Sequence, residues 1–146
     1  MEQNFQNGTN MIRRDLLKTD RNLILYLIFS AITCNIYSLF FMASLVDDIN
    51  YVAFPRDGKR TMNFWLLAFV LVPVTCGLAY WVWMHNLANR VGDEARARGI
   101  QTDFSAVSFW LWNVLGSFII IGPFIYLHML FTTMNSICTD YNQNGC

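Results

Sequence analysis

Cys34 and Cys76 are the residues whose chemistry stands out first in this chain of 146 residues, because both follow a threonine in the middle of a long uncharged segment. Two thiols at equivalent positions can form a site for a soft metal or for redox chemistry. Neither has a CxxC partner or a neighbouring cation, and the spacing of the four cysteines matches no zinc pattern. Cysteine also packs well beside a helix break. We therefore favour the packing role and expect neither a metal ion nor a cofactor.

His85 and His128 form a second candidate pair, because they occupy equivalent positions when the chain is aligned with itself. Ionisable groups inside a membrane are usually functional, so the two imidazoles are candidates for a proton path or a metal site. Both histidines, however, fall near the end of an apolar segment, where an imidazole can face water or lipid headgroups. We keep them as weak functional candidates and expect no shared site between them.

Acidic and basic side chains are absent from three long stretches, residues 22–46, 61–89 and 104–139. A proton-coupled pump, a voltage sensor or an intramembrane protease would be expected to carry such a group there. The chain also has no HExxH motif, no nucleophile elbow and no phosphate-binding loop. We therefore expect no catalytic residue and no enzymatic activity.

The composition is typical of a membrane protein. Hydrophobic residues make up 55% of the chain and charged residues only 14%, against about 25% charged residues in a typical soluble domain. Each uncharged stretch is longer than the about 20 apolar residues that cross a bilayer as a helix. The formal net charge is zero, which argues against a nucleic-acid partner because phosphate binding needs a net basic face. The predicted main partner is the lipid bilayer.

Each uncharged stretch is interrupted near its centre, and the interruptions define three repeats. An offset of 42 residues aligns Thr33 with Thr75 and Cys34 with Cys76. The break motifs are Thr33-Cys34-Asn35, Thr75-Cys76-Gly77 and Gly122-Pro123. An apolar half precedes each break, and an aromatic or amphipathic half follows it. The predicted fold is therefore an all-α, multi-pass membrane protein with three repeated kinked transmembrane helices, each extended by an amphipathic helix.

The domain boundaries follow from these repeats. Residues 1–20 form a polar lead, residues 21–139 a single membrane domain and residues 140–146 a polar tail. Within the domain, the repeats cover about 21–50, 61–99 and 103–139. The second repeat closes with a charged helical run that is predicted to end at Gly99.

Two membrane arrangements fit the three stretches. If each is one kinked span, seven cations lie on one side and three on the other, which by the positive-inside rule puts the N-terminus in the cytoplasm and the C-terminus outside. If each is a re-entrant hairpin with its tip at the break, all ten Lys and Arg residues share one side, which also obeys the rule. We favour three spans, because a turn between half-length helices needs hydrogen-bond partners inside lipid.

The tandem break motif resembles a known family. Thr33-Cys34-Asn35-Ile36-Tyr37 and Thr75-Cys76-Gly77-Leu78-Ala79 are similar to a Thr-Cys-Gly-Ile-Tyr-type motif of the small bacterial membrane proteins grouped as domain of unknown function 4234. Gly92-Asp93-Glu94-Ala95 and the closing Met134-Asn135-Ser136-Ile137 also resemble that family, so the resemblance covers roughly residues 21–137. Asn35 departs from the usual glycine and Ala79 from the usual tyrosine. The resemblance implies a bacterial inner membrane location and no particular activity.

Small and polar residues near the breaks favour close helix packing, so we expect a homo-oligomer or a partner membrane protein. The first functional interpretation is a non-enzymatic assembly or accessory subunit. The alternative is a small oligomeric channel or transporter for ions or small solutes, with broken helices lining its pathway. A third interpretation is a membrane-bound redox or metal protein that uses Cys34 and Cys76. Cys138 and Cys146 could pair only if the C-terminus faces an oxidising compartment.

Overall fold

The computed structural model describes residues 17–145, and every regular element in this range is a helix. The elements in chain order are α2 (Leu23–Ile32), α3 (Ile36–Asp57), α4 (Phe64–Leu66), η1 (Leu67–Leu71), α5 (Val72–Val74), α6 (Leu78–Ala97), α7 (Ala106–Ser108), η2 (Phe109–Val114), η3 (Leu115–Ile119) and α8 (Gly122–Asn144). The segments η1 and η2 are π-helical, and η3 is a 3-10 helix. The predicted all-α class is confirmed. Residues 1–16, most of the predicted polar lead, and Cys146 lie outside the described range.

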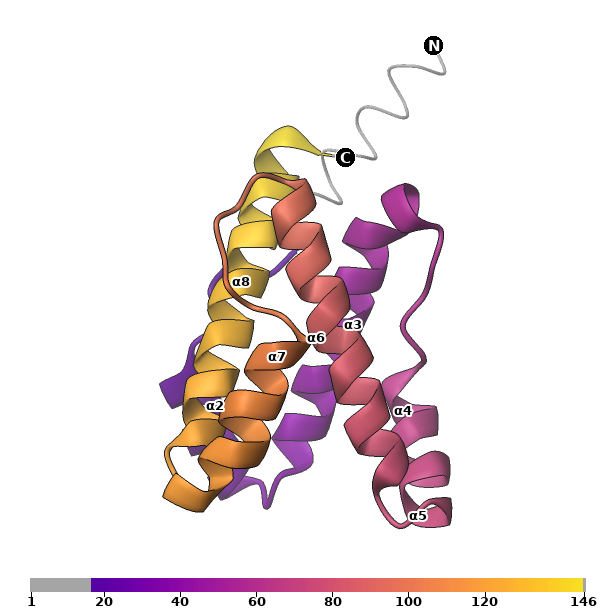
Figure 1. The fold of residues 1–146 in the computed structure, drawn as a ribbon, viewed down its shortest axis with the longest axis vertical. Coiled ribbons are helices and arrows are strands. Elements are labelled where there is room, and N and C mark those ends of the chain that lie inside the picture. The colour runs from indigo at the N-terminus through magenta and orange to yellow at the C-terminus, as the bar shows by residue number, and fades with distance from the viewer. Residues whose placement is uncertain (1–16, 146) are drawn as a thin grey trace.

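These elements form three helical hairpins, each pairing a short limb with a long helix. In the first, α2 packs against α3; in the second, the limb from α4 to α5 packs against α6; in the third, the limb from α7 to η3 packs against α8. All three chain reversals lie at one end of the molecule, which we call the tip end (Figure 1). The long helices end at the opposite end, which we call the polar end.

The predicted kinked spans differ from this arrangement. At each break the chain turns back on itself, so an uncharged stretch contributes two antiparallel limbs instead of one continuous bent helix. In the described part of the chain, no helix combines the length and the apolar character that a membrane crossing requires. Leu17 and Asn142 are joined by a hydrogen bond, so the two described ends of the chain meet at the polar end.

The core is built mainly by the three long helices. Their fully buried apolar side chains include Leu45 and Ile49 on α3, Leu87 on α6, and Leu130 and Met134 on α8. These positions recur at helical spacing on the inner face of each helix. Burying a side chain of this size stabilises the fold by about 1.5 to 3 kcal/mol. The short limbs add Leu67 of η1 and Phe109 of η2 to this core and cover the tip halves of the long helices.

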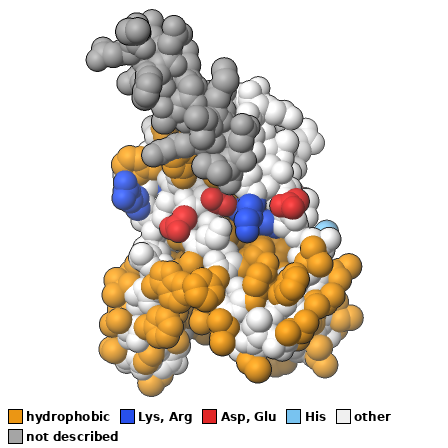
Figure 2. Space-filling view, turned by 180° about the vertical axis from the view of Figure 1, so that it is seen from behind, with side chains coloured by type: hydrophobic (Ala, Val, Ile, Leu, Met, Phe, Trp, Pro, Cys, Tyr) orange, Lys and Arg blue, Asp and Glu red, His pale blue; other side chains and the backbone are white. Residues whose placement is uncertain are grey.

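The surface is divided between the two ends. Apart from Phe54 and Met62, every exposed large hydrophobic side chain of the described residues falls within 24–40, 66–82 or 107–124, the segments that flank the reversals. Every ion pair of the described residues lies toward the polar end. Figure 2 shows the consequence on one face: hydrophobic side chains cover the tip end, and charged side chains form a belt above them.

Three helix ends can be compared with the predicted boundaries. Helix α3 continues to Asp57, past the predicted repeat end near residue 50, and places Pro55 in its last turn. Helix α8 continues to Asn144, so the predicted polar tail from residue 140 is mostly helical. Helix α6 ends at Ala97, and Gly99 adopts the left-handed conformation with φ of +73°, as the sequence predicts.

Candidate functional site

Thr33 controls the first reversal through both its backbone and its hydroxyl. The hydroxyl donates to the Phe29 carbonyl at 2.6 Å and accepts the Tyr37 N–H at 2.9 Å. One side chain thus closes the end of α2 and caps the start of α3. Cys34 donates its N–H to Ala31, and Asn35 donates to Ser30 at 2.7 Å, which is the hydrogen-bond pattern of a Schellman helix end.

The second reversal repeats this hydrogen bonding 42 residues later. The Thr75 hydroxyl donates to the Leu71 carbonyl at 2.7 Å and accepts the Ala79 N–H at 3.0 Å. The N–H groups of Cys76 and Gly77 bond to the carbonyls of Pro73 and Val72, as the equivalent groups do in the first reversal. In both reversals, all five consecutive N–H groups from the threonine onward have a partner.

The residues after each threonine adopt the left-handed conformation that such a turn requires. Cys34 and Cys76 have φ of 50° and 51°, Asn35 has φ of 68° and Gly77 has φ of 90°. Asparagine tolerates this region better than most residues, so Asn35 forms in the first reversal the turn that Gly77 forms in the second. Both cysteines are free and exposed. This exposure does not support the packing role favoured from the sequence.

The third reversal lies at Ile120 and Ile121, just before the predicted Gly122-Pro123 break. Ile120 has φ of 66°, and Gly122 already begins α8 with Pro123 in its first turn. Glycine is needed at 122 for another reason: a Cβ there would lie 2.3 Å from the Cα of Gly116 and 2.3 Å from the carbonyl oxygen of Trp112. Gly122 therefore allows α8 to pack closely against the preceding limb, while the chain turns before it.

The two histidines occupy different surroundings. His85 lies half-buried on α6, and its Nδ1 accepts a hydrogen bond from the Trp110 indole at 3.0 Å. His128 is exposed on α8. No hydrogen bond or ring contact joins the two imidazoles in the described part of the chain. The residues at 17–145 also contain no group of three His, Cys, Asp or Glu side chains close enough to hold a metal ion.

Arg21 ties the start of the first hairpin to α3 and α8. Its guanidinium is buried, forms an ion pair with Asp48 and donates to the Sγ of Cys138 at 3.5 Å. Its backbone N–H and carbonyl are both bound by the amide of Asn135. Burial is the largest influence on the neighbouring acid and raises the pKa of Asp48, although Arg21 opposes the shift. Burial likewise raises the pKa of the Cys138 thiol.

Arg90 joins α6 to the end of α3 and to the linker that follows it. Its Nε donates to Asp57 at 2.9 Å, and its Nη1 donates to the Thr61 hydroxyl at 2.8 Å and to Asn50. Asn50 in turn accepts the Thr61 N–H at 2.6 Å and donates to the Thr61 carbonyl at 3.1 Å. Partial burial raises the pKa of Asp57, but the bonds from Arg90 and the Lys59 N–H outweigh it and lower the pKa overall.

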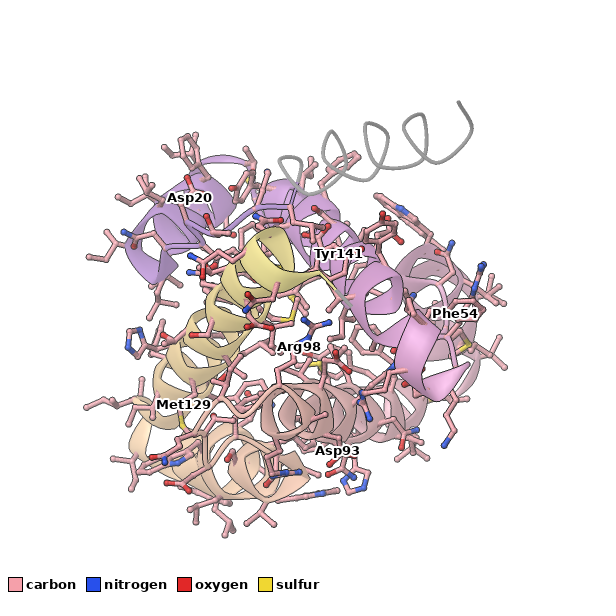
Figure 3. All side chains as sticks on the ribbon, turned by 90° about the horizontal axis from the view of Figure 1, so that it is seen from above. Asp20, Phe54, Asp93, Arg98, Met129 and Tyr141 are labelled. Carbon is pink, nitrogen blue, oxygen red and sulfur yellow. The ribbon has the colours of Figure 1, made fainter. Side chains whose placement is uncertain are left out.

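Glu94 and Arg98 link all three long helices. The Glu94 carboxylate is almost fully buried and accepts from Arg56 of α3 and from Arg98, each at 2.7 Å. Arg98 also donates to Asp140 of α8 at 2.9 Å and lies 5.4 Å from the ring centroid of Tyr141. Figure 3, which looks onto the polar end, shows Arg98 in the middle of the bundle. These bonds hold α3, α6 and α8 together where they leave the apolar half.

A family model described as domain of unknown function (DUF4234) matches residues 21–93, which is half of the chain. The chain belongs to the DUF4234 family. The match contains both Thr-Cys reversals and ends within α6. The third hairpin lies outside it, so the wider resemblance up to residue 137 stays a prediction. No curated protein and no solved structure matches the chain.

The buried charges of this DUF4234 protein were not recognised from the sequence as structural residues. The sequence pattern assigns Arg21, Arg90 and Arg98 to one side of the predicted membrane, and Arg90 and Arg98 also to a charged helical run. A partial signal is present for two of them, since Arg21 and Arg90 each border an uncharged stretch. Their partners are far away in the chain, Arg98 and Asp140 being 42 positions apart, and such pairs cannot be assigned without the fold.

Proposed function

We propose that the protein is a non-enzymatic membrane protein that inserts its three helical hairpins into a bilayer from one side and serves as an assembly or accessory subunit. The polar end would remain at the headgroup level and in water. The observation that carries this proposal is the segregation of exposed side chains: large hydrophobic ones surround the tips, and ion pairs occupy the other end. Contiguous exposed apolar surface of this kind marks contact with a membrane or a protein partner.

The dimensions of the hairpins suit one leaflet. Helix α2 has 10 residues, which corresponds to a length of about 15 Å at 1.5 Å per residue. The hydrocarbon core of a bilayer is about 30 Å thick, so tips inserted to this depth would lie near its midplane. Trp65 and Trp110 are partly exposed near the starts of their limbs, away from the reversals, where an interfacial aromatic belt would lie.

The closed reversals remove the main physical objection to re-entrant hairpins. An unsatisfied backbone N–H inside lipid costs several kcal/mol, which is why three full spans are favoured from sequence alone. At both Thr-Cys reversals, the threonine hydroxyl and the Schellman bonds provide partners for these N–H groups. We therefore place both described ends of the chain on the same side of the membrane, instead of on opposite sides.

The channel or transporter alternative is supported by one observation. A cavity of about 370 Å³ lies among the hairpins and is lined in part by Tyr26, Ser38, Tyr80, Asn113 and Tyr126. The Tyr126 hydroxyl is buried and has no hydrogen-bond partner among the described residues. Sealed liposomes containing the purified protein test this alternative. Passage of ions or small solutes that is lost in Tyr126→Phe would favour transport over an accessory role.

The native thiols at the tips provide the test of membrane insertion. A variant that retains Cys34 or Cys76 as its single cysteine is labelled with an environment-sensitive fluorophore and reconstituted in vesicles with spin-labelled lipids. We expect stronger quenching by a spin label deep in the acyl chain than by one on the headgroup. A matched label on Asp93→Cys, at the polar end, should show the reverse order.

The opposite result would contradict the proposal. Fluorophores at Cys34 and Cys76 that respond only to a water-soluble quencher would show that the tips do not enter the bilayer. An accessory role additionally predicts a stable complex, either with a second copy or with another membrane protein. A strictly monomeric protein that is purified under mild conditions without any partner would argue against that role.

A further inference from the structure

A groove with two chemically different halves runs along α6, beside the linker that joins α3 to α4. Its volume is about 890 Å³. The linker residues Lys59 to Met62 form one wall, and the face of α6 between Leu78 and Asp93 forms the other. Figure 1 shows the linker descending alongside α6 from the polar end toward the tip end. Thr75 of the second reversal marks the lower end of the groove.

The upper half of the groove is cationic. Four cations and two carboxylates line the groove, which gives its lining a net charge of +2. The cations are Arg56, Lys59, Arg60 and Arg90, and the carboxylates are Asp57 and Asp93. Arg90 is balanced by Asp57, and Arg56 by Glu94. Within residues 17–145, Lys59 and Arg60 form no ion pair, and both are exposed. These two side chains are therefore available to an anion.

The lower half of the groove is apolar. Leu78, Ala79 and Val82 of α6 line it, and Val82 is 63% exposed. From Leu78 to Arg90 the helix rises about 18 Å, which is close to the thickness of one hydrocarbon leaflet, about 15 Å. The charged half thus lies above the apolar half, in the order in which a headgroup and an acyl chain are arranged in a leaflet.

The groove is held open by hydrogen bonds that do not involve its free cations. The Trp83 indole donates to the Met62 carbonyl at 3.2 Å, and Arg90 bonds to the Thr61 hydroxyl at 2.8 Å. The Arg60 guanidinium lies 4.8 Å from the centroid of the Phe54 ring, which restricts its motion at the upper rim. The wall is therefore fixed in advance, and a ligand would not have to order it.

We propose that this groove binds one anionic phospholipid, with its phosphate at Lys59 and Arg60 and one acyl chain along Leu78 and Val82. This inference rests on the proposed membrane insertion, because it assumes that α6 stands in a leaflet with its charged end at the headgroups. The charge pattern supplies selectivity for an anionic headgroup over a zwitterionic one. Because the apolar half extends below the cations, tight binding is expected to need an acyl chain as well as an anionic headgroup.

The test uses native mass spectrometry of the full-length protein in detergent, titrated separately with phosphatidylglycerol and phosphatidylcholine. We expect phosphatidylglycerol to bind more tightly. Each cation near an anionic lipid contributes about a fivefold factor, so Lys59→Gln with Arg60→Gln should weaken phosphatidylglycerol binding about 25-fold. Lys18→Gln, an exposed lysine outside the groove, should change it less than twofold. Helicity and thermal unfolding of each variant confirm that it is folded.

A second pair of measurements separates a lipid from a free anion. Val82→Trp fills the apolar half and should weaken phosphatidylglycerol binding without changing the weak binding of inorganic phosphate; Leu78→Ser serves if the tryptophan variant does not fold. The proposal would be overturned if Lys18→Gln weakened phosphatidylglycerol binding as much as Lys59→Gln with Arg60→Gln does. It would also be overturned if Val82→Trp left phosphatidylglycerol binding unchanged. Lipid selectivity and the depth of the tips are measured in separate experiments. If the tip fluorophores are quenched by deep spin labels but the protein shows no preference for phosphatidylglycerol, only the lipid-binding groove is refuted. If the protein prefers phosphatidylglycerol but the tip fluorophores are not quenched, only the membrane insertion is refuted.

Discussion

At the scale of single residues, the threonine hydroxyl explains how the chain reverses without leaving a backbone N–H group unpaired. Thr33 and Thr75 each accept from the N–H four residues ahead and donate to the carbonyl four residues behind. The adjacent cysteine attracts attention in the sequence, but its side chain is exposed and free. The residue that the turn depends on is therefore the threonine, and the cysteine contributes mainly its left-handed backbone.

Replacing this hydroxyl by a methyl group should destabilise the fold. We expect Thr33→Val and Thr75→Val each to lower the free energy of unfolding by about 1 to 3 kcal/mol, because each leaves a backbone N–H without its partner. Chemical denaturation in detergent micelles measures the change. Thr→Ser at the same sites should restore most of the stability. Thr139→Val, which removes only an exposed bond to a helix carbonyl, is the matched control. Equal effects at all three sites would refute the role assigned to the turns.

The carboxylate of Asp140 makes stability depend on pH. The hydrogen bond from Arg98 lowers the pKa of this group below its usual 3.8, so the folded state binds the proton less tightly than the unfolded state does. The stabilisation is therefore present above the unfolded pKa and is lost as the pH falls through the lowered value. We expect the free energy of unfolding of the wild type to exceed that of Asp140→Asn by up to about 1 kcal/mol at pH 7. Denaturation curves between pH 2.5 and 7 should show this difference shrinking, while a constant difference would contradict it; Asp103→Asn is the control.

At the scale of elements, the positions of the two Thr-Cys breaks could be predicted from sequence and the third only approximately, but the geometry of none of them could. Uncharged stretches with small or polar residues at their centres indicate an interrupted helix. Whether the chain kinks or reverses depends on backbone dihedrals and on two hydrogen bonds of one hydroxyl, which a pattern of residue types does not specify. The π-helical turns at η1 and η2 could not be predicted from the sequence either. For η1 the structure offers a physical reason, because Pro73, just after it, lacks the N–H that an α-helical hydrogen bond needs.

The pairing of long helices at the polar end was also beyond sequence reasoning, and two neighbouring acids can test it. Glu94 is buried between Arg56 and Arg98, whereas Asp93 forms an exposed pair with Arg96. Breaking a buried pair leaves charges uncompensated, so Glu94→Gln should cost about 2 to 4 kcal/mol. Asp93→Asn should change the free energy of unfolding by less than about 1 kcal/mol. Similar losses in the two variants would show that the Glu94 network does not hold the helices together.

At the scale of the whole molecule, the charge distribution takes on a different meaning. Counted along the chain, seven cations against three agree with three membrane crossings. In the fold, the described cations gather toward one end, and several of them are committed to ion pairs: Arg21 to Asp48, Arg90 to Asp57, and Arg98 to Glu94 and Asp140. The net charge of the chain is zero, but the charges are unevenly distributed: one half of the molecule is apolar, and the other half contains the ion pairs.

The side of the membrane on which each loop lies tests this account most directly. Single cysteines at Lys59, Gln101 and Asn144, each placed in a chain without its native cysteines, are exposed to a membrane-impermeant maleimide in right-side-out and inverted vesicles. Re-entrant hairpins predict that all three positions are modified from the same side. Modification of Lys59→Cys and Gln101→Cys from opposite sides would establish spanning helices and contradict the account.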